Sequence, residues 1–368
     1  LSVPGYIAAR DITPNLFREV IDSILVGAFN AIHRWSKPLF EENLDGVAVA
    51  LTSAIASRGT PGIAHSSAGK AGVEALVKSL AREWDLADLE TDLHVIRTLQ
   101  PALEAGRYGV TVAVHDRRTI TGVWPGLHDR AYGVAIDVGS TTIAGHLANL
   151  GDGAVLASAG VMNPQIRFGE DLMSRVSYAM MNDSGAAEMT AAVRLALNGL
   201  LAQLANRVGI KRDAILELSI VGNPIMHHLV LGIDPIPLGS APFALATDRA
   251  VTVRADELDL ITHPGARVYV LPCIAGHVGA DTAGVILAEE PQDATDLTLI
   301  VDVGTNAEIV LGNRDRLLAA SSPTGPAFEG AQISSGQRAA PGAIERVRVD
   351  RQTLEPRFRV IGVDAWSD

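Results

Sequence analysis

Two stretches of the sequence combine an aspartate, a glycine and hydroxyl side chains in a pattern suited to phosphate chemistry. In the first, YGVAIDVGSTTIAGHL, an apolar run leads into Asp137, Gly139 and three hydroxyl residues, Ser140, Thr141 and Thr142. Glycine lets the backbone approach a ligand closely, so that successive N–H groups and hydroxyls of one turn point into the same small space. Such a turn suits a phosphate, and a Mg²⁺ ion carried by that phosphate would compensate the charge of the aspartate.

A second copy of the pattern, LIVDVGTNAEIVLG, places Asp302, Gly304, Thr305 and Asn306 after another apolar run. Asp302 follows Asp137 by 165 residues (302 − 137), the length of one α/β lobe. A single Asp-x-Gly turn also serves ordinary hairpins, but its repetition at this period indicates two lobes of similar build that face each other across a cleft. The arrangement resembles the actin, sugar kinase and Hsp70 superfamily (ASKHA), whose two RNase-H-like lobes each offer such a hairpin to the phosphates of ATP.

Composition narrows the classes of function. The 368 residues carry a net charge of −12, which argues against nucleic acid or an anionic membrane as the main partner, because both reward basic surfaces. We see no signal peptide and no apolar run long enough to span a membrane. The single cysteine, Cys273, excludes an internal disulfide and a four-cysteine iron–sulfur cluster within this chain. We expect a cytoplasmic protein, and Leu1 in place of methionine hints at a cut N-terminus.

The first 84 residues predict two helices with a strand between them. PNLFREVIDSILVGAFNAIHRW (14–35) has helical spacing, a strand is expected at 46–51, and a second helix follows in SSAGKAGVEALVKSLAREW. The apolar residues of the first helix fall on one broad face: Phe17, Val20, Ile21, Ile24, Leu25, Phe29 and Ile32.

Three of these segments, VGAFN, ALTSAIASRGTPG and HSSAGKAGVEALVKSLAREW, resemble the middle of a short-chain dehydrogenase/reductase, closest to the 2,4-dienoyl-CoA reductase type. The resemblance covers residues 14–84. It implies that Ser53 stands at the catalytic serine position and that Lys70 is the lysine that binds the cofactor ribose. Ser66, four residues before Lys70, stands where most of that family has a tyrosine, a departure for which the dienoyl-CoA reductase branch is known.

A second interpretation of this segment is a solvated helix face, because lysine and serines on an alanine-rich helix usually face water. The Gly-rich turn that receives a dinucleotide is absent before Pro14, and the C-terminal part of the reductase family is missing. We therefore expect Ser66 and Lys70 to share a helix face, being four residues apart, without forming an NADP site.

Residues 85–130 indicate a linker module, with an acidic helical stretch, DLADLETDLHVIRTLQPALEAG, and two short strands, GVTVAVHD and TITGVW. Further along, residues 185–209 predict a long amphipathic helix. Core packing explains its apolar residues, which are Val193, Leu195, Leu197, Leu200, Leu201, Leu204 and Val208.

VGNPIMHHLVLGIDP predicts a short apolar helix capped by Asn223, with Pro224 at its first position and Gly232 at its end. His227 and His228 are adjacent and so point in different directions on a helix. We expect histidines satisfied in a core or a cleft rather than a shared metal site.

Two glycine-containing loops are further candidates for ligand contact. In VYVLPCIAGHVGADTAGVIL, a strand delivers a loop with Gly279 and Asp281 onto a helix start, which suits an anion or lobe closure, and the lone Cys273 is expected to be a small buried hydrophobe. In SSPTGPAFEGAQISSGQ, Gly325 and Gly330 would let the backbone pass close under a ligand.

Six segments, in order, resemble the ATPase domain of the reductive activators of corrinoid proteins: YGVAIDVGSTTIAGHL, NPQIRFGEDLMSRV, VGNPIMHHLVLGIDP, LPCIAGHVGADT, IVDVGTNAEIVLG and SPTGPAFEGAQISSG. The resemblance runs from about residue 87 to the end. It implies that ATP drives electron delivery from an N-terminal [2Fe–2S] domain to the cobalt of a corrinoid methyltransferase, which returns inactive Co(II) to Co(I). By the same resemblance, Asp137 and Asp302 are the catalytic residues that handle Mg²⁺ and the attacking water. The implied phosphate-binding residues are Gly139, Ser140, Thr141, Thr142, Gly304, Thr305, Asn306, Gly325 and Gly330.

The sequence departs from that family in two places. The cluster motif C-x₄-C-x₂-C…C is absent, and the reductase-like segment takes its place. The chain also ends at Asp368, about where the family continues into a Gly-Ser-Gly turn and further helices. We therefore expect no [2Fe–2S] cluster in this chain, an incomplete second lobe, weak nucleotide binding, and no reactivation of a corrinoid protein by the chain alone.

The sequence thus predicts an α/β protein with two RNase-H-like, actin-like ATPase lobes, the second of them truncated. The expected domains are a reductase-like fragment (1–84), a linker module (85–130), a first lobe (131–296) and a second lobe (297–368). The predicted function is ATP binding and hydrolysis in corrinoid activation, with ATP and Mg²⁺ as cofactors and a corrinoid protein or methyltransferase as partner.

Two alternatives remain open at this point. One is an NADP-dependent short-chain reductase of enoyl-CoA-type substrates that uses Ser53, Ser66 and Lys70. The other is a nucleotide-gated binding module without turnover. We expect neither nucleic acid nor a membrane as a partner, and a homodimer is left open.

Overall fold

The computed structural model describes residues 6–42, 50, 55–84, 89–107, 109–304, 306–324, 336 and 340–367. The chain forms two compact units, Leu1–His128 and Asp129–Asp368. In the part of the chain that the structure describes, no helix is both long and apolar enough to cross a membrane. Outside this part lie the expected strand at 46–51, apart from residue 50, and the predicted site residues Ser53, Thr305, Gly325 and Gly330.

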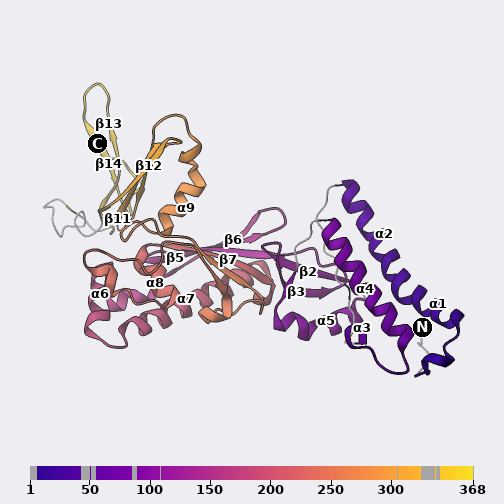
Figure 1. Ribbon diagram of the computed structural model, residues 1–368. Helices are drawn as coiled ribbons and strands as arrows, with labels where there is room; N and C mark the ends of the chain where they lie inside the picture. The colour runs from indigo at the N-terminus through magenta and orange to yellow at the C-terminus, as the bar shows by residue number, and fades with distance from the viewer. Residues whose placement is uncertain are drawn as a thin grey trace. The chain divides into compact units, whose positions relative to one another are not determined.

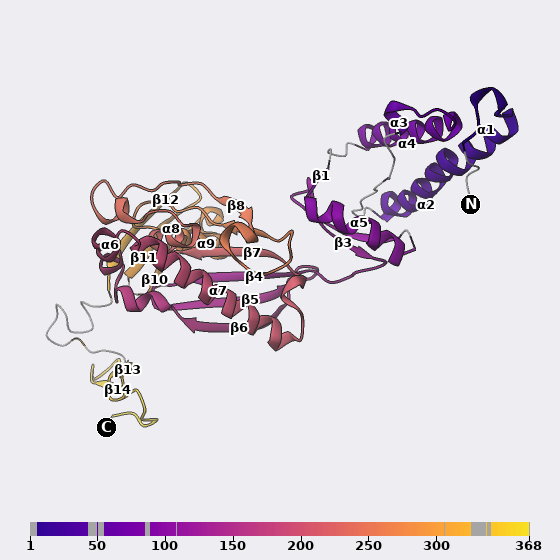
Figure 2. The ribbon, with the colours of Figure 1, turned by 90° about the horizontal axis from the view of Figure 1, so that it is seen from below.

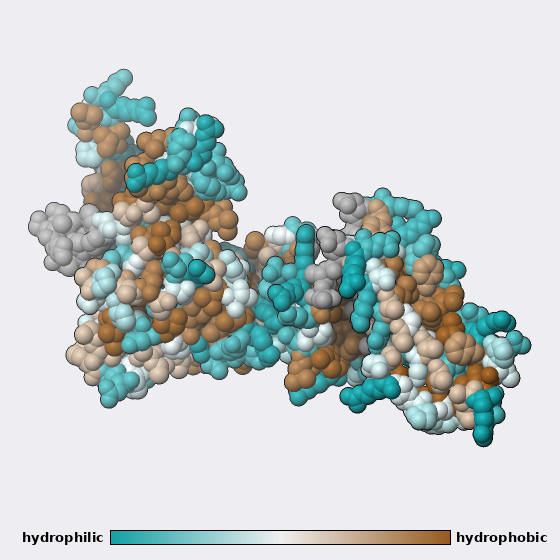
Figure 3. Space-filling view, in the orientation of Figure 1, coloured by the Kyte–Doolittle hydropathy of each residue, from teal (hydrophilic) through white to brown (hydrophobic). Residues whose placement is uncertain are grey.

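The first unit begins with helices. They are α1 (Pro14–Ile21), α2 (Gly27–Glu42), α3 (Ile55–Arg58) and α4 (Ala64–Glu83), with a π-helical turn (Asp22–Val26) between α1 and α2. The Thr13 hydroxyl accepts a hydrogen bond from Leu16 N (3.2 Å) and so caps α1. Of the apolar face predicted for the first helix, Val20 is buried, whereas Phe17 and Phe29 remain exposed. Hydrophobic side chains are visible on the surface of this helical part (Figure 3).

The linker forms a small sheet with one helix. Its elements are β1 (Glu90–Thr91), α5 (Leu93–Ala105), β2 (Val110–His115) and β3 (Thr119–Pro125), and the sheet order is β1-β3-β2. The expected helix and two strands are therefore present, and β2 pairs with β3 in the antiparallel sense. The His94 ring hydrogen-bonds to Thr121 O (2.7 Å), which ties α5 to β3.

The second unit is built on a six-stranded sheet with the order β6-β5-β4-β7-β9-β8. The strands are β4 (Tyr132–Val138), β5 (Thr142–Asn149), β6 (Val155–Met162), β7 (Ile215–Gly222), β8 (Val251–Arg254) and β9 (Arg267–Val270). β4 is antiparallel to β5 and parallel to β7, and β7 is parallel to β9. A three-stranded antiparallel meander joined to parallel strands is the RNase-H arrangement that the sequence predicted.

Helices cover this sheet on both faces (Figures 1 and 2). They are α6 (Leu172–Met181), α7 (Gly185–Val208), α8 (Pro224–Leu231) and α9 (Ala280–Glu289). α7 packs Leu200 and Leu204 against Gly145 of β5, on the face that buries Ile136 and Ile143. The prediction that Leu195 belongs to this core is wrong, because its side chain is 75% exposed.

The remaining strands form two smaller antiparallel sheets. They are β10 (Thr298–Val303), β11 (Asn306–Asn313) and β12 (Arg316–Pro323) in one sheet, and β13 (Ile344–Val349) with β14 (Pro356–Val360) in the other. β10 and β11 form the predicted second hairpin, in which Asp302 lies opposite Glu308. The molecule is of the α/β class, as predicted.

Candidate functional site

The turn between β4 and β5 is tight. β4 ends at Val138 and β5 begins at Thr142. A Cβ atom added at Gly139 would lie 2.5 Å from Thr142 O, closer than real side chains approach a backbone oxygen. The predicted glycine is therefore required by the width of the turn itself.

The carbonyl oxygens of this turn are all held from one side. Asn163 Nδ2 donates to Gly139 O (2.8 Å), Arg175 Nη2 donates to Ser140 O (2.5 Å), and Asn163 N donates to Thr141 O (2.8 Å). Asn163 and Arg175 are both completely buried. Sequence analysis did not identify either residue as part of the site.

The fixed carbonyls decide where the amide groups point. A trans peptide is planar with its C=O and N–H in opposite directions, so the N–H groups of residues 140–142 are directed away from the two buried side chains. Three successive N–H groups on one side of a turn form a concavity with positive partial charge, the type of cradle that accommodates an anion. The Thr141 and Thr142 side chains at this turn are exposed.

Asp137 lies directly before this turn, on the face of the sheet opposite to α7. It pairs in register with Val221 of β7, and Val221 packs against Gly284 of α9. The Asp137 side chain retains contact with solvent, but its pKa is raised to about 6. Burial of the carboxylate is the largest cause, and the negative charges of Asp281 and Asp302 contribute the rest.

The same mutual effect extends to two carboxylates that the predicted site did not include. Burial raises the pKa of Asp281, at the start of α9, and the charge of Asp302 adds to the rise. Burial also raises the pKa of Glu308 on β11, with smaller contributions from Asp281 and Asp302. The two hairpins, 165 residues apart in the chain (302 − 137), and the first turn of α9 therefore bring Asp281 and Asp302 within electrostatic reach of both Asp137 and Glu308.

These carboxylates fit a divalent cation that keeps part of its hydration shell. In the described residues, no three histidine, cysteine or carboxylate side chains converge as direct ligands of one metal ion. Mg²⁺ keeps several waters and is commonly bound by one or two carboxylates together with substrate phosphates. That requirement is compatible with the predicted pair, Asp137 and Asp302. A cation between carboxylates whose charges repel each other would lower the cost of ionising all of them.

The second turn repeats the design of the first in part. Gly304 N donates to Asn306 O (2.8 Å), and the Thr324 hydroxyl donates to Gly304 O (2.8 Å), so this turn also has a carbonyl held by a side chain. Among the described residues, a Cβ atom added at Gly304 would meet Asn306 O alone, at 3.4 Å, so this glycine has more room there than its counterpart in the first turn. Thr305, predicted to bind phosphate, lies outside the described residues.

The N-termini of α8 and α9 lie against each other beside the first turn. A Cβ atom added at Gly279 would lie 2.6 Å from the Cα atom of Asn223, so the two segments approach closely only because glycine is present. The Asn223 side chain accepts hydrogen bonds from Ile225 N (3.1 Å) and Met226 N (3.0 Å), as expected for a helix cap. As predicted, a strand (β9) leads through this loop to the start of α9. That the loop suits an anion or lobe closure stays a prediction.

The two adjacent histidines of α8 are both buried. His228 is satisfied as predicted, through contacts of its ring with Pro224 O (2.9 Å) and Ala246 N (3.1 Å). His227 Nε2 has no hydrogen-bond partner among the residues that the structure describes, which departs from the expectation that both rings are satisfied. Burial lowers the pKa of His227 to about 4, and the charge of His228 lowers it too, so the ring is neutral at neutral pH. Cys273 is buried, as expected, and burial raises its pKa to about 12.

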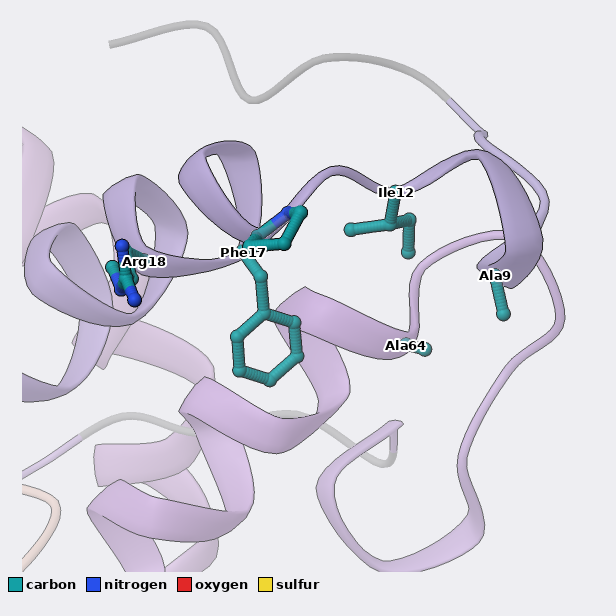
Figure 4. Close-up of a pocket in the computed structure, with 6 residues that line it drawn as sticks. Ala9, Ile12, Phe17, Arg18 and Ala64 are labelled. Carbon is teal, nitrogen blue, oxygen red and sulfur yellow. The ribbon is translucent and has the colours of Figure 1, made fainter.

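Two of the three predicted reductase residues, Ser66 and Lys70, lie on α4 of the first unit, and Ser53 lies outside the described residues. Ser66 is buried, with 7% of its surface exposed, and Lys70 is half-buried one helical turn later. A shallow apolar hollow of about 440 Å³ is present elsewhere in this unit, where Phe17 of α1 and Ala64 of α4 form parts of its wall (Figure 4). Arg18 is the single charged residue of its lining, so the hollow offers no catalytic pair.

Matches to known protein families cover successive segments of the chain. The family described as the RACo linker region matches residues 69–130, the RACo middle region matches 132–293, and the C-terminal domain of RACo, the ASKHA domain, matches 296–367. The family described as enoyl-(acyl carrier protein) reductase matches residues 6–88 and so overlaps the start of the linker match.

Individual proteins show the same division. Corrinoid activation enzyme RamQ of Eubacterium limosum is 35% identical over 234 residues, which are 64% of this chain and 39% of that protein. The probable 2,4-dienoyl-CoA reductase 3 of Caenorhabditis elegans is 35% identical over 77 residues, 21% of this chain and 25% of that protein.

A solved structure agrees with the fold. The structure described as a reductive activator for corrinoid, iron–sulfur protein superposes with a TM-score of 0.66 at 30% identity and covers 86% of this chain and 49% of its own. This chain spans between two fifths and one half of the length of these two corrinoid activators.

Proposed function

We propose that this chain is a corrinoid reductive activator of the RACo type, whose linker, middle and C-terminal models match residues 69–130, 132–293 and 296–367. In this proposal it binds ATP with Mg²⁺ between its two aspartate turns and uses it to support reduction of a corrinoid protein. The observation that carries the proposal is the electrostatic coupling of Asp137, Asp281 and Asp302 across segments far apart in sequence. Such a group of carboxylates beside a turn of outward-facing amides is suited to a metal–phosphate ligand.

The residues of the site divide the work between them. The N–H groups of residues 140–142 bind phosphate oxygens, and the exposed hydroxyls of that turn add further donors. Asp137 and Asp302 hold the cation and orient the attacking water. Burial raises the pKa of Asp281 and of Glu308, which makes these carboxylates stronger proton acceptors than an ordinary exposed carboxylate. When bound, Mg²⁺ neutralises charge on the phosphate oxygens.

The relatives' names supply the substrate class. They describe a corrinoid activation enzyme and a reductive activator for a corrinoid, iron–sulfur protein. We infer that the partner of this chain is a corrinoid protein of a methyl-transfer system and that its cobalt is reduced from Co(II) to Co(I). These 368 residues include one cysteine, so the electrons come from a group that they do not ligate by themselves. Reduction of Co(II) to Co(I) fits a reducing, cytoplasmic location.

An anaerobic assay tests this function. The purified chain is mixed with a Co(II) corrinoid protein and an external electron donor, and the Co(I) absorbance is followed with ATP–Mg²⁺, with ADP–Mg²⁺ and without nucleotide. The proposal predicts that Co(I) forms only with ATP and not in Asp302→Ala, a result that would overturn the expectation from the sequence that the chain alone does not reactivate a corrinoid protein. Equal formation of Co(I) without nucleotide contradicts it.

The NADP-dependent reductase has less support. Its N-terminal match covers residues 6–88, a quarter or less of the length of this chain. Ser66 is buried, so a substrate would reach its hydroxyl only after the helix packing changed. We therefore assign the nucleotide chemistry to the second unit.

A further inference from the structure

Arg175 of α6 is a charged side chain buried completely behind the β4–β5 turn. Its guanidinium donates to three uncharged acceptors: Nη2 to Ser140 O (2.5 Å), Nε to Gly169 O (3.1 Å) and Nη1 to Met226 Sδ (3.5 Å). Within the described ranges of the chain, no carboxylate forms an ion pair with it.

A buried guanidinium without a carboxylate is unfavourable for folding, because desolvation is not repaid by an opposite charge. Burial lowers the pKa of Arg175 to about 10, which still leaves the side chain charged at neutral pH. The charge of Asp171 opposes that lowering, but one oxygen of its carboxylate accepts from Ser174 N (2.7 Å) in capping α6. The charge of Arg175 is therefore directed at the carbonyl oxygens and sulfur around it.

Arg175 and Asn163 hold different parts of the same turn. Asn163 binds the carbonyls of Gly139 and Thr141, and Arg175 binds the carbonyl of Ser140 between them. Loss of Arg175 alone would leave both ends of the turn fixed and would free the central peptide to rotate. That rotation would turn the N–H of Thr141 away from the other two amides of the cradle.

We propose that Arg175 is a positioning residue for phosphate: it fixes the peptide between Ser140 and Thr141 so that the amide faces the ligand, and its positive charge favours an anion on the far side of that peptide. The inference deepens the proposed function and rests on it, because the anion is the phosphate of ATP. Arg175 itself touches no ligand in this account and acts through the turn.

Arg194 of α7 provides a matched control. It too is an arginine that binds a backbone carbonyl, with Nε donating to Val230 O (3.0 Å) and Nη1 to Asp259 (2.9 Å), and it makes no hydrogen bond to the turn. The experiment compares the full chain with its Arg175→Met, Arg175→Lys and Arg194→Met variants. Isothermal titration gives the Kd for ATP–Mg²⁺, hydrogen exchange in the absence of nucleotide reports on residues 139–142, and denaturation reports on stability.

The expected result separates positioning from general stability. Arg175→Met raises the Kd for ATP–Mg²⁺ at least tenfold and accelerates amide exchange in residues 139–142. Arg194→Met lowers stability but changes neither quantity by more than twofold. Arg175→Lys keeps the charge but cannot reproduce the planar set of donors, so its Kd lies between those of the wild type and Arg175→Met. If Arg175→Met does not fold, the lysine variant carries the comparison.

Two results would overturn the inference: a folded Arg175→Met chain that binds ATP–Mg²⁺ as the wild type does, or an equal loss of affinity in Arg175→Met and Arg194→Met. A wild-type chain that binds no ATP–Mg²⁺ would instead refute the proposed function. In that case the exchange rates alone decide whether Arg175 holds the turn. Equal rates in the wild type and Arg175→Met would then also refute the inference that Arg175 holds the turn.

Discussion

The carboxylate of Asp137 occupies a place where the protein disfavours its charge. Its pKa is raised from 3.8 to about 6, first by burial and then by Asp281 and Asp302. The folded chain therefore binds this proton more tightly than the unfolded chain does, so the contribution of Asp137 to stability falls as the pH rises from about 4 to about 6. A carboxylate that lowers stability at neutral pH is typical of a site that a cation completes.

Asp137→Asn tests this electrostatic account. We expect the variant to be more stable than the wild type at pH 7 and nearly equal to it at pH 4, where the folded wild type is protonated. The rise in the pKa of Asp137 from 3.8 to about 6 corresponds to about 3 kcal/mol. Because solvent in contact with Asp137 screens this effect, we expect the free energy of unfolding to rise by about 1 kcal/mol at pH 7. Denaturant unfolding at the two pH values measures it.

The control for this substitution is Asp183→Asn, at an exposed position before α7. We expect its free energy of unfolding to stay within about 0.5 kcal/mol of the wild type at both pH values. A loss of stability in Asp137→Asn at pH 7 would contradict the account, because it would mean that the charge of Asp137 is already compensated within the chain.

At the scale of single elements, local signals in the sequence predicted the structure correctly, whereas tertiary contacts could not be predicted from them. The cap of α8 by Asn223, with Pro224 at the first position and Gly232 in the left-handed conformation at the end, depends on neighbours in sequence and was predicted. The roles of Asn163 and Arg175 depend on α6 packing beside a turn formed earlier in the chain. Nothing in the spacing of NPQIRFGEDLMSRV reveals which carbonyls these side chains reach.

The two turns give a matched pair of glycine substitutions. A Cβ atom at Gly139 would lie 2.5 Å from Thr142 O, whereas at Gly304 the one near atom in the described part of the chain, Asn306 O, is 3.4 Å away. We expect Gly139→Ala to lower the free energy of unfolding by about 1–3 kcal/mol, because backbone must shift, and to weaken ATP–Mg²⁺ binding. Gly304→Ala should stay within about 1 kcal/mol of the wild type.

Thermal unfolding with and without ATP–Mg²⁺ distinguishes the two glycine variants. Equal destabilisation by both alanines would show that the first turn is less constrained than its backbone distances indicate. A Gly139→Ala chain with unchanged stability and affinity would lead to the same conclusion.

At the scale of the molecule, the repeat of one short pattern predicted more than any single motif. The spacing of Asp137 and Asp302 indicated two hairpins of related build, and the charges of Asp302 and Asp281 do act on Asp137. Asp281 and Glu308 were not assigned to this group in advance, because an aspartate at a helix start and a glutamate on a strand are common on surfaces. Their role depends on how separate segments of the second unit meet, which sequence spacing does not encode.

The N-terminal unit shows a different limit of sequence reasoning. Helical periodicity located α1, α2 and α4, but it did not indicate that Phe17 and Phe29 would be exposed, at 39% and 44%. Periodicity identifies which residues share a face, whereas burial depends on what packs against that face. The Ser66–Lys70 spacing has the same limit, because it fixes a shared helix face and leaves open whether a cofactor binds there.

The central claim is that the nucleotide of this protein is ATP held by the two aspartate turns, and thermal unfolding of the whole chain tests it most directly. A ligand that binds the native state raises stability by about 2.7 kcal/mol at a concentration one hundred times its Kd. We predict that ATP–Mg²⁺ raises the Tm, that NADPH does not, and that the ATP effect disappears in Asp302→Ala. A rise in Tm with NADPH and none with ATP–Mg²⁺, or an ATP effect unchanged in Asp302→Ala, would contradict the claim.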